Sequence, residues 1–197
     1  MTNIITREQW LNKLATALEA EFLTEGLIMP KYRISTGFPS KGGLAAKKRT
    51  IGQCWSPKAS NDQTTEIIIS ITQDDLMTVA GVLVHEMVHA VVGVEAGHGP
   101  IFGKLARACH LEGKLTATTE GEAFKSRVQP LLDMIGAYPH SKLDHTVGQK
   151  VQSTRMIKVT CNENMLGLDC GMIFRTSAKW TENTLQCPRC GSDTTIG

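Results

Sequence analysis

Residues 76–92 read LMTVAGVLVHEMVHAVV and are apolar on nearly every face of a helix. A helix that is apolar all round is normally buried, so we expect the central core helix of the protein here. Asp74 and Asp75 precede the run, where they can supply an N-cap and a negative first turn. The longest uninterrupted apolar stretch, residues 76–84, ends at His85 and Glu86. This stretch is well short of the length needed to span a membrane. Three glycines break the helix after residue 92: Gly93, Gly97 and Gly99.

The centre of this helix carries the motif His85-Glu86-Met-Val-His89. Residues four apart lie one turn apart on the same helix face, so the two imidazoles can share a zinc ion. Glu86 is displaced by one position, so its carboxylate can reach a zinc-bound water without binding the metal itself. It could then accept the proton of that water during attack on a carbonyl. Two core histidines satisfied by hydrogen bonds are the alternative, but three polar groups buried together without a shared purpose are costly.

A catalytic zinc needs a third protein ligand and an open fourth position. His98 is the best candidate, because the glycines on both sides allow the backbone to return an imidazole to the metal. A helix N-cap is the alternative role for His98. Glu95 is a rival ligand six residues after His89, although the matching metzincin pattern requires glycine where this chain has Val92. Two further candidates follow in the chain: His110 and Glu112.

The flanking sequence predicts a small α+β domain. Residues 7–23 form an amphipathic pattern that begins with a capping box at Thr6 and Gln9. Three runs with β character follow, at residues 31–35, 51–56 and 66–72. Pro100 suits the first turn of a helix over residues 100–110. A last helix is expected over residues 120–135, with Pro130 as a kink or a boundary. Cys54 and Cys109 stand alone in apolar surroundings and are expected to be buried, unreactive thiols.

The spacing His85-Glu86-x-x-His89, eight further residues and then His98-Gly99-Pro100-x-Phe102 resembles the SprT-like metallopeptidase family, which includes the eukaryotic Spartan protease. Gly52-x-Cys54 and the strand after it also resemble the segment before that family's active helix. The resemblance covers most of residues 6–135 and continues into the cysteine-rich tail. It implies a zincin domain of helices with a short antiparallel sheet, a catalytic zinc on His85, His89 and His98, and Glu86 as the base. It also implies a protein substrate: Spartan-type members cut proteins crosslinked to DNA and are activated by DNA, whereas some bacterial-type members carry labels that point to transcription.

The C-terminal tail predicts a second, structural zinc. Cys187-Pro-Arg-Cys190-Gly191 is a zinc-knuckle sequence, and its expected partners are Cys161 and Cys170. Eight residues separate this first pair instead of the usual two to four, which an inserted loop at residues 162–169 would explain. Strand-like runs at residues 155–160 and 172–176 complete a zinc ribbon. Free thiols or a disulfide are the alternative for the four cysteines. The sequence therefore predicts a zincin domain at residues 1–140, a linker at 141–153 and a ribbon at 154–197.

Charge and composition give only weak evidence about binding partners. The 197 residues are 41% hydrophobic and carry a net charge of +2, which does not by itself indicate nucleic acid. Residues 41–49 hold four basic residues and no acid, and the ribbon holds an aromatic that could stack on a base. Single-stranded DNA is thus a candidate partner through Lys41, Lys47, Lys48, Arg49 and Trp180, with a solvated loop and ribbon core packing as the alternatives. No secretory signal and no membrane span are seen, so a cytoplasmic protein is expected.

Three functions fit these observations. The first is a DNA-associated protease of the SprT-like kind. The second is a general cytoplasmic peptidase whose ribbon recognises protein. The third is a non-enzymatic, zinc-stabilised protein that binds DNA or is associated with transcription. Glu86 argues against the third, because a purely structural three-histidine site does not need a base beside it.

Overall fold

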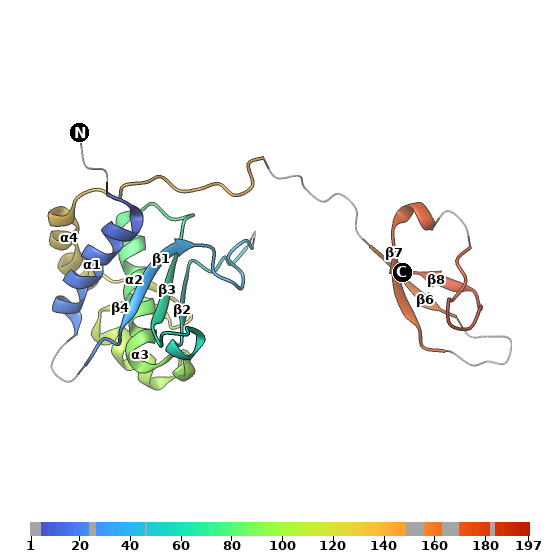
Figure 1. Cartoon of the computed structure of the whole chain (residues 1–197), viewed down its shortest axis with the longest axis horizontal. Helices are drawn as coiled ribbons and strands as arrows, with labels where there is room; N and C mark the ends of the chain where they lie inside the picture. Colours follow the sequence, from blue (N-terminus) through green and yellow to red (C-terminus); the bar gives the residue numbers. More distant parts are fainter. Residues whose placement is uncertain (1–4, 24–26, 46, 149–155, 163–169, 182–183) are drawn as a thin grey trace. The chain divides into compact units, whose positions relative to one another are not determined.

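The chain divides into two compact units, Met1–Val147 and Gly148–Gly197 (Figure 1). The computed structural model describes residues 5–23, 27–45, 47–148, 156–162, 170–181 and 184–197. The first unit extends to Val147, beyond the domain end predicted at residue 140. Most of the predicted linker's second half, residues 149–153, lies outside the described residues.

Within its described residues, the first unit contains four α-helices and two small sheets, so the α+β class is confirmed. The helices are α1 (Arg7–Phe22), α2 (Leu76–Val92), α3 (Pro100–Ala108) and α4 (Glu122–Ile135). The main sheet contains β1 (Tyr32–Gly37), β2 (Gly52–Trp55) and β3 (Thr65–Ser70). Helices α1 and α2 pack against this sheet, and α4 packs against α1 and α2. Their apolar faces form one core that includes Trp10, Ile67, Leu83, Phe102 and Phe124, all fully buried.

The main sheet is mixed, so the expected short antiparallel sheet is confirmed for one of its two strand pairs and wrong for the other. Strand β3 lies in the middle of the order β1-β3-β2. It pairs with β2 in antiparallel and with β1 in parallel orientation. The central place suits β3, because Ile67 and Ile69 are completely buried there. The chain therefore forms the two edge strands first, β1 and then β2, and β3 is placed between them.

A second sheet, the hairpin of β4 (Leu111–Lys114) and β5 (Ala117–Glu120), was not predicted. Its strands read Leu-Glu-Gly-Lys and Ala-Thr-Thr-Glu, so they lack a run of β-branched apolar residues and mostly face solvent. Strands of this kind give almost no signal of period two. The hairpin lies between α3 and α4 in the chain, and β5 contacts α2.

Local sequence accounts well for α1 and α2. Thr6 and Gln9 form the predicted capping box, in which each side chain bonds the other residue's backbone N–H. Asp75 caps α2 by accepting a hydrogen bond from the N–H of Thr78 at 2.8 Å. None of the described helices, α2 included, is long and apolar enough to cross a membrane.

The segment after α4 is hydrogen-bonded to and packed against the rest of the first unit. Its Ser141 carbonyl accepts a bond from Arg7 at 2.7 Å, and the N–H of Leu143 donates to the Ile71 carbonyl at 2.8 Å. The His145 ring lies 5.9 Å from the Phe38 ring. These contacts explain why residues 141–147 belong to the first unit although their sequence is polar and has no period.

The second unit is a three-stranded sheet with the order β7-β6-β8. Its strands are β6 (Ile157–Cys161), β7 (Ile173–Thr176) and β8 (Thr194–Ile196), all antiparallel to their neighbours. Strands β6 and β7 fall within one or two residues of the two predicted runs, and residue 155 of the first run lies outside the described residues. Strand β8 was not predicted. Only three residues of the described part of this unit are buried hydrophobics: Val159, Cys161 and Cys187.

Candidate metal centres and active site

Helix α2 presents His85 and His89 one turn apart, and the chain after the helix brings His98 to the same place. The reversal needs backbone that only glycine adopts easily. Gly93 has φ 86° and Gly97 has φ 52°, on either side of a short 3₁₀ turn, Val94–Ala96. The glycines that favoured His98 in the sequence are therefore the residues that turn the chain toward the two helix histidines.

The three imidazoles face one another through the same ring nitrogen. The Nε2 atoms of His85 and His98 are 3.2 Å apart, and those of His89 and His98 are also 3.2 Å apart. Ligands at 2.0–2.1 Å from a tetrahedral zinc ion are separated by about 3.3 Å. The spacing of the nitrogens thus fits a shared metal ion, and the trio is one of two groups in the described residues that could hold one.

The surroundings keep these histidines neutral, which is the form that binds metal. Burial, followed by the neighbouring His89 and His98, lowers the pKa of His85 to about 3. Burial, followed by the neighbouring His98, lowers the pKa of His89 to about 4. Burial also lowers the pKa of His98.

Phe102 supports the trio from one side. Its fully buried ring lies 4.9 Å from the His85 ring, 4.3 Å from the His89 ring and 5.0 Å from the His98 ring, measured between centroids. Because α3 starts at Pro100, as predicted, Phe102 falls in its first turn and faces α2. One aromatic ring therefore packs against all three candidate ligands.

Glu86 lies beside the histidines but does not join them. Its side chain is 6% exposed, and burial raises the pKa of its carboxyl to about 8. A Cβ atom at position 52 would lie 2.4 Å from Glu86 Oε1, so glycine in β2 leaves the space that this carboxylate occupies. The carboxylate is thus held between α2 and the edge strand.

The other candidates for the third ligand are engaged elsewhere. Glu95 is exposed and accepts hydrogen bonds from Ser56 at 3.2 Å and Lys58 at 3.5 Å. His110 follows α3 with φ 60° and packs edge-on against Phe22, at 6.4 Å between ring centroids. The Glu112 carboxylate lies against Gly121 at the start of α4. Cys54 and Cys109 are buried, as expected. Burial, followed by the Glu86 carboxylate, raises the pKa of Cys54 to about 12, and burial raises that of Cys109 to about 11, which favours the thiol over the reactive thiolate.

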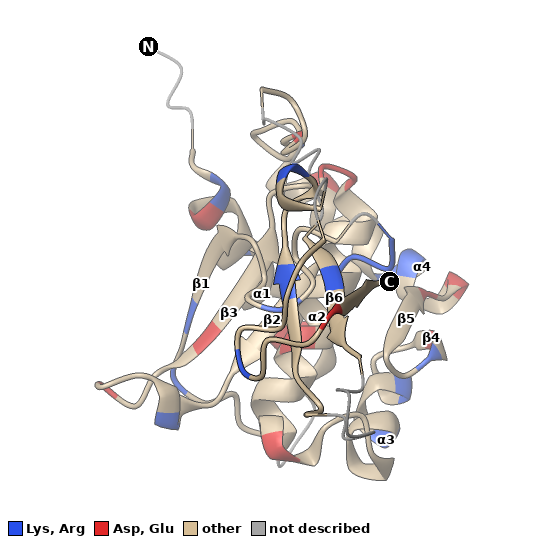
Figure 2. Cartoon of the chain, turned by 90° about the vertical axis from the view of Figure 1, so that its right-hand side faces the viewer, with Lys and Arg blue, Asp and Glu red and all other residues tan. Residues whose placement is uncertain are grey.

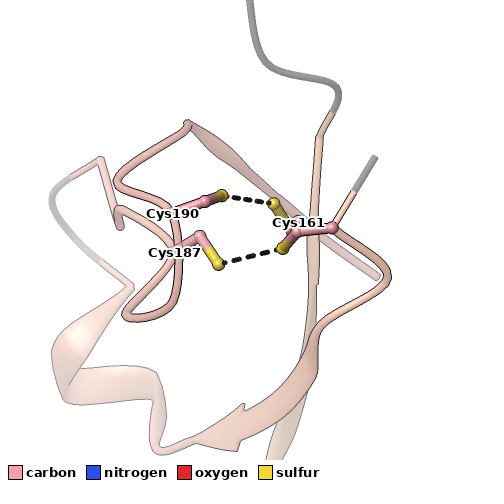
Figure 3. Close-up of side chains that lie close together, drawn as sticks. Cys161, Cys187 and Cys190 are labelled. Carbon is pink, nitrogen blue, oxygen red and sulfur yellow. Dashed lines mark hydrogen bonds between the residues drawn. The ribbon is translucent and has the colours of Figure 1, made fainter. Parts of the chain in front are cut away.

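The four tail cysteines converge in the second unit. Cys161 Sγ lies 3.5 Å from Cys190 Sγ (Figure 3). Cys170 Sγ lies 3.5 Å from Cys187 Sγ. Disulfide sulfurs would be 2.03–2.05 Å apart, and all four thiols are free. Four thiolates around a tetrahedral zinc are separated by about 3.8 Å. The group could therefore hold a metal ion, despite the unusual spacing of the first pair. Of the predicted inserted loop at residues 162–169, only Asn162 lies within the described residues.

The turn between Cys187 and Cys190 has the conformation of a knuckle. The N–H of Gly191 donates to the Cys187 carbonyl at 2.8 Å, and the N–H of Cys187 donates to the Ser192 carbonyl at 2.7 Å. Gly191 has φ 76°, which explains why the sequence has glycine directly after the second cysteine.

The predicted DNA contacts are divided between the two units. In the first unit, Lys41, Lys47 and Lys48 are exposed, while Arg49 bonds the Ala45 carbonyl at 3.2 Å and lies 3.5 Å from His145. In the second unit, Trp180 is 64% exposed, with Lys179 Nζ 5.7 Å from its ring centroid. Elsewhere on the first unit, positively and negatively charged side chains are interspersed. Helix α4, for example, carries both basic and acidic residues (Figure 2).

Searches against models of protein families, curated proteins and solved structures found no match to this chain. Its function is therefore inferred from the geometry of the two candidate metal centres.

One contact of the three-histidine site was not predicted from the sequence. Thr118, in the unpredicted hairpin, has its hydroxyl 2.9 Å from His85 Nδ1. A threonine in a short polar strand carries no signal of its own, so only the fold reveals the pair.

Proposed function

We propose that this chain is a zinc-dependent endopeptidase of the SprT-like kind, with a second zinc that stabilises its C-terminal ribbon. One observation carries the proposal: three imidazole nitrogens lie at the spacing of tetrahedral zinc ligands, with a buried carboxylate on the next residue of the same helix. A structural three-histidine site has no need of that carboxylate. This arrangement favours the enzyme over a non-enzymatic binding protein.

The roles of the residues follow from their chemistry. His85, His89 and His98 would hold zinc through Nε2. Zinc in such a site acts as a Lewis acid and lowers the pKa of a water to about 7. Glu86 accepts the proton from the water that attacks the peptide carbonyl, and its carboxyl then returns a proton to the leaving amine. Burial raises the pKa of the Glu86 carboxyl, whereas the positive charge of a bound zinc ion would lower it and favour the carboxylate that accepts the proton.

Strand β2 offers a place for the substrate. It is an edge strand, and among the described strands it pairs only with β3. An extended peptide can bind such an edge through main-chain hydrogen bonds. Gly52 brings the backbone of this edge next to the Glu86 carboxylate. A peptide paired with β2 would thus run past the candidate base, which suits an endopeptidase acting on unfolded segments of protein.

Single-stranded DNA is the proposed second partner. The loop at residues 41–49 carries exposed lysines without an acid, which suits phosphate contacts. The exposed Trp180 of the ribbon provides an aromatic face on which a base can stack. Binding of DNA would raise the local concentration of DNA-bound protein substrates at the active site.

We expect the full-length protein to cleave a DNA-binding protein faster when single-stranded DNA is present, and to cleave an unstructured protein that does not bind DNA at an unchanged rate. The measurement is the initial rate of cleavage at several salt concentrations. Replacing Lys47 and Lys48 by Gln should reduce the salt slope of DNA binding by about 0.7 for each phosphate that is no longer neutralised. Equal rates with and without DNA would contradict the DNA role, and no cleavage of either substrate would contradict the peptidase.

A further inference from the structure

Strand β5 contacts α2, the helix that carries His85 and His89. A Cβ atom at Gly81 of α2 would lie 2.0 Å from Glu120 Oε1, so the Glu120 side chain of β5 lies directly against the helix at this glycine. One helical turn later, His85 faces Thr118 of the same strand. Glu120 and Thr118 of β5 thus contact α2 one helical turn apart, and Thr118 is the residue that meets the histidine.

The hydrogen bond between Thr118 and His85 has a definite direction when metal is bound. His85 Nε2 points to His98 and must offer its lone pair to the metal, so the proton of the neutral ring is on Nδ1. This Nδ1–H donates to Thr118 Oγ1 over 2.9 Å. The bond selects the tautomer that can bind metal and stops the ring from rotating about its Cβ–Cγ axis.

The other helix histidine has no such support. His89 is 8% exposed, and its Nδ1 atom is buried with no hydrogen-bond partner among the described residues. Its orientation depends on packing against Phe102 and on the metal itself. The polar support of the helix ligands is therefore concentrated on His85.

We propose that Thr118 is a positioning residue for the metal site: its hydroxyl fixes the His85 tautomer and ring orientation. This inference rests on the proposed three-histidine zinc site. Hydrogen-bond partners of metal-binding histidines typically contribute 10- to 100-fold in metal affinity. Loss of the Thr118 hydroxyl should therefore weaken metal binding at the histidines by about that factor and leave the ribbon unaffected.

The test compares three variants of the full-length protein in competition titrations of Zn²⁺ against a chelator. Thr118→Val removes the hydroxyl and should weaken the histidine site about 10- to 100-fold. Thr118→Ser keeps the hydroxyl and should bind within a few-fold of wild type. Thr119→Val is the matched control, because Thr119 lies next in β5 on the opposite, exposed face and should bind as wild type does.

The outcomes separate this inference from the proposed function. Wild-type affinity in Thr118→Val would overturn the positioning role while leaving the zinc site intact. A Thr118→Ser variant as weak as Thr118→Val would also overturn it, because the hydroxyl would then not be the cause. A wild-type protein that binds zinc only through its cysteines would overturn the proposed site itself, and the positioning role with it.

Discussion

Replacement of Glu86 by Gln is expected to lower peptide hydrolysis by about 10²–10⁴-fold, the usual contribution of a general base. The amide has the shape of the carboxylate but cannot accept a proton from the attacking water. Zinc should remain bound, because the carboxylate is not one of the three facing ligands. The measurement is kcat/KM on an unstructured protein, together with zinc content.

The structure also indicates that this variant will fold. Glu86 is buried, so replacing its carboxylate by a neutral amide of the same shape adds no desolvation cost. Glu95→Gln is the matched control, because Glu95 is exposed and bound to Ser56 and Lys58, and it should keep full activity. Substantial activity in Glu86→Gln would mean that another residue is the base.

Replacement of Cys187 by Ser is expected to unfold the second unit while the first stays folded. The described residues of that unit bury only three hydrophobic side chains, which is too small a core for independent stability. Structural zinc in small domains supplies about 10–16 kcal/mol of binding free energy, which acts as folding free energy. Loss of one thiolate should remove most of it.

Limited proteolysis followed by mass spectrometry measures this outcome. The variant should lose residues 148–197 rapidly and retain a resistant fragment of the first unit. Pro188→Ser is the matched control, because Pro188 is exposed in the same knuckle but provides no ligand. A ribbon that resists protease equally in wild type and Cys187→Ser would contradict a structural zinc.

The features predicted from the sequence are those set by residues near one another in the chain. Helix α2 follows from a continuous apolar run with an Asp75 cap, and the approach of His98 follows from glycines a few residues away. The cysteine group was predicted because thiols in a unit with almost no apolar core have few other uses. In each case, the residues from which the feature was predicted also make the local contacts that form it.

The features that were not predicted depend on contacts between distant segments. The parallel pairing of β1 with β3 is set by which strand fills the buried centre, and no local pattern records that choice. The β4–β5 hairpin is stabilised where Glu120 meets Gly81 and Thr118 meets His85, far apart in sequence. Its polar strands therefore gave no signal, and the Thr118 contact was missed with them.

Pro130 was predicted to be a kink or a boundary, and it is not a boundary, because α4 runs through it from Glu122 to Ile135. Proline removes one backbone hydrogen bond, here the one to the carbonyl of Ser126. Both residues are exposed, so water can satisfy that carbonyl. The buried side of α4, with Phe124, Val128 and Leu132, keeps its packing and holds the helix together.

Zinc content per chain, measured by atomic emission on purified full-length variants, tests the central claim most directly. The wild type should contain two zinc ions. Glu95→Ala should also contain two, whereas His98→Ala should contain one, retained by the cysteines. A wild type with a single zinc that survives in His98→Ala, or a Glu95→Ala variant that loses one, would contradict a catalytic zinc held by His85, His89 and His98.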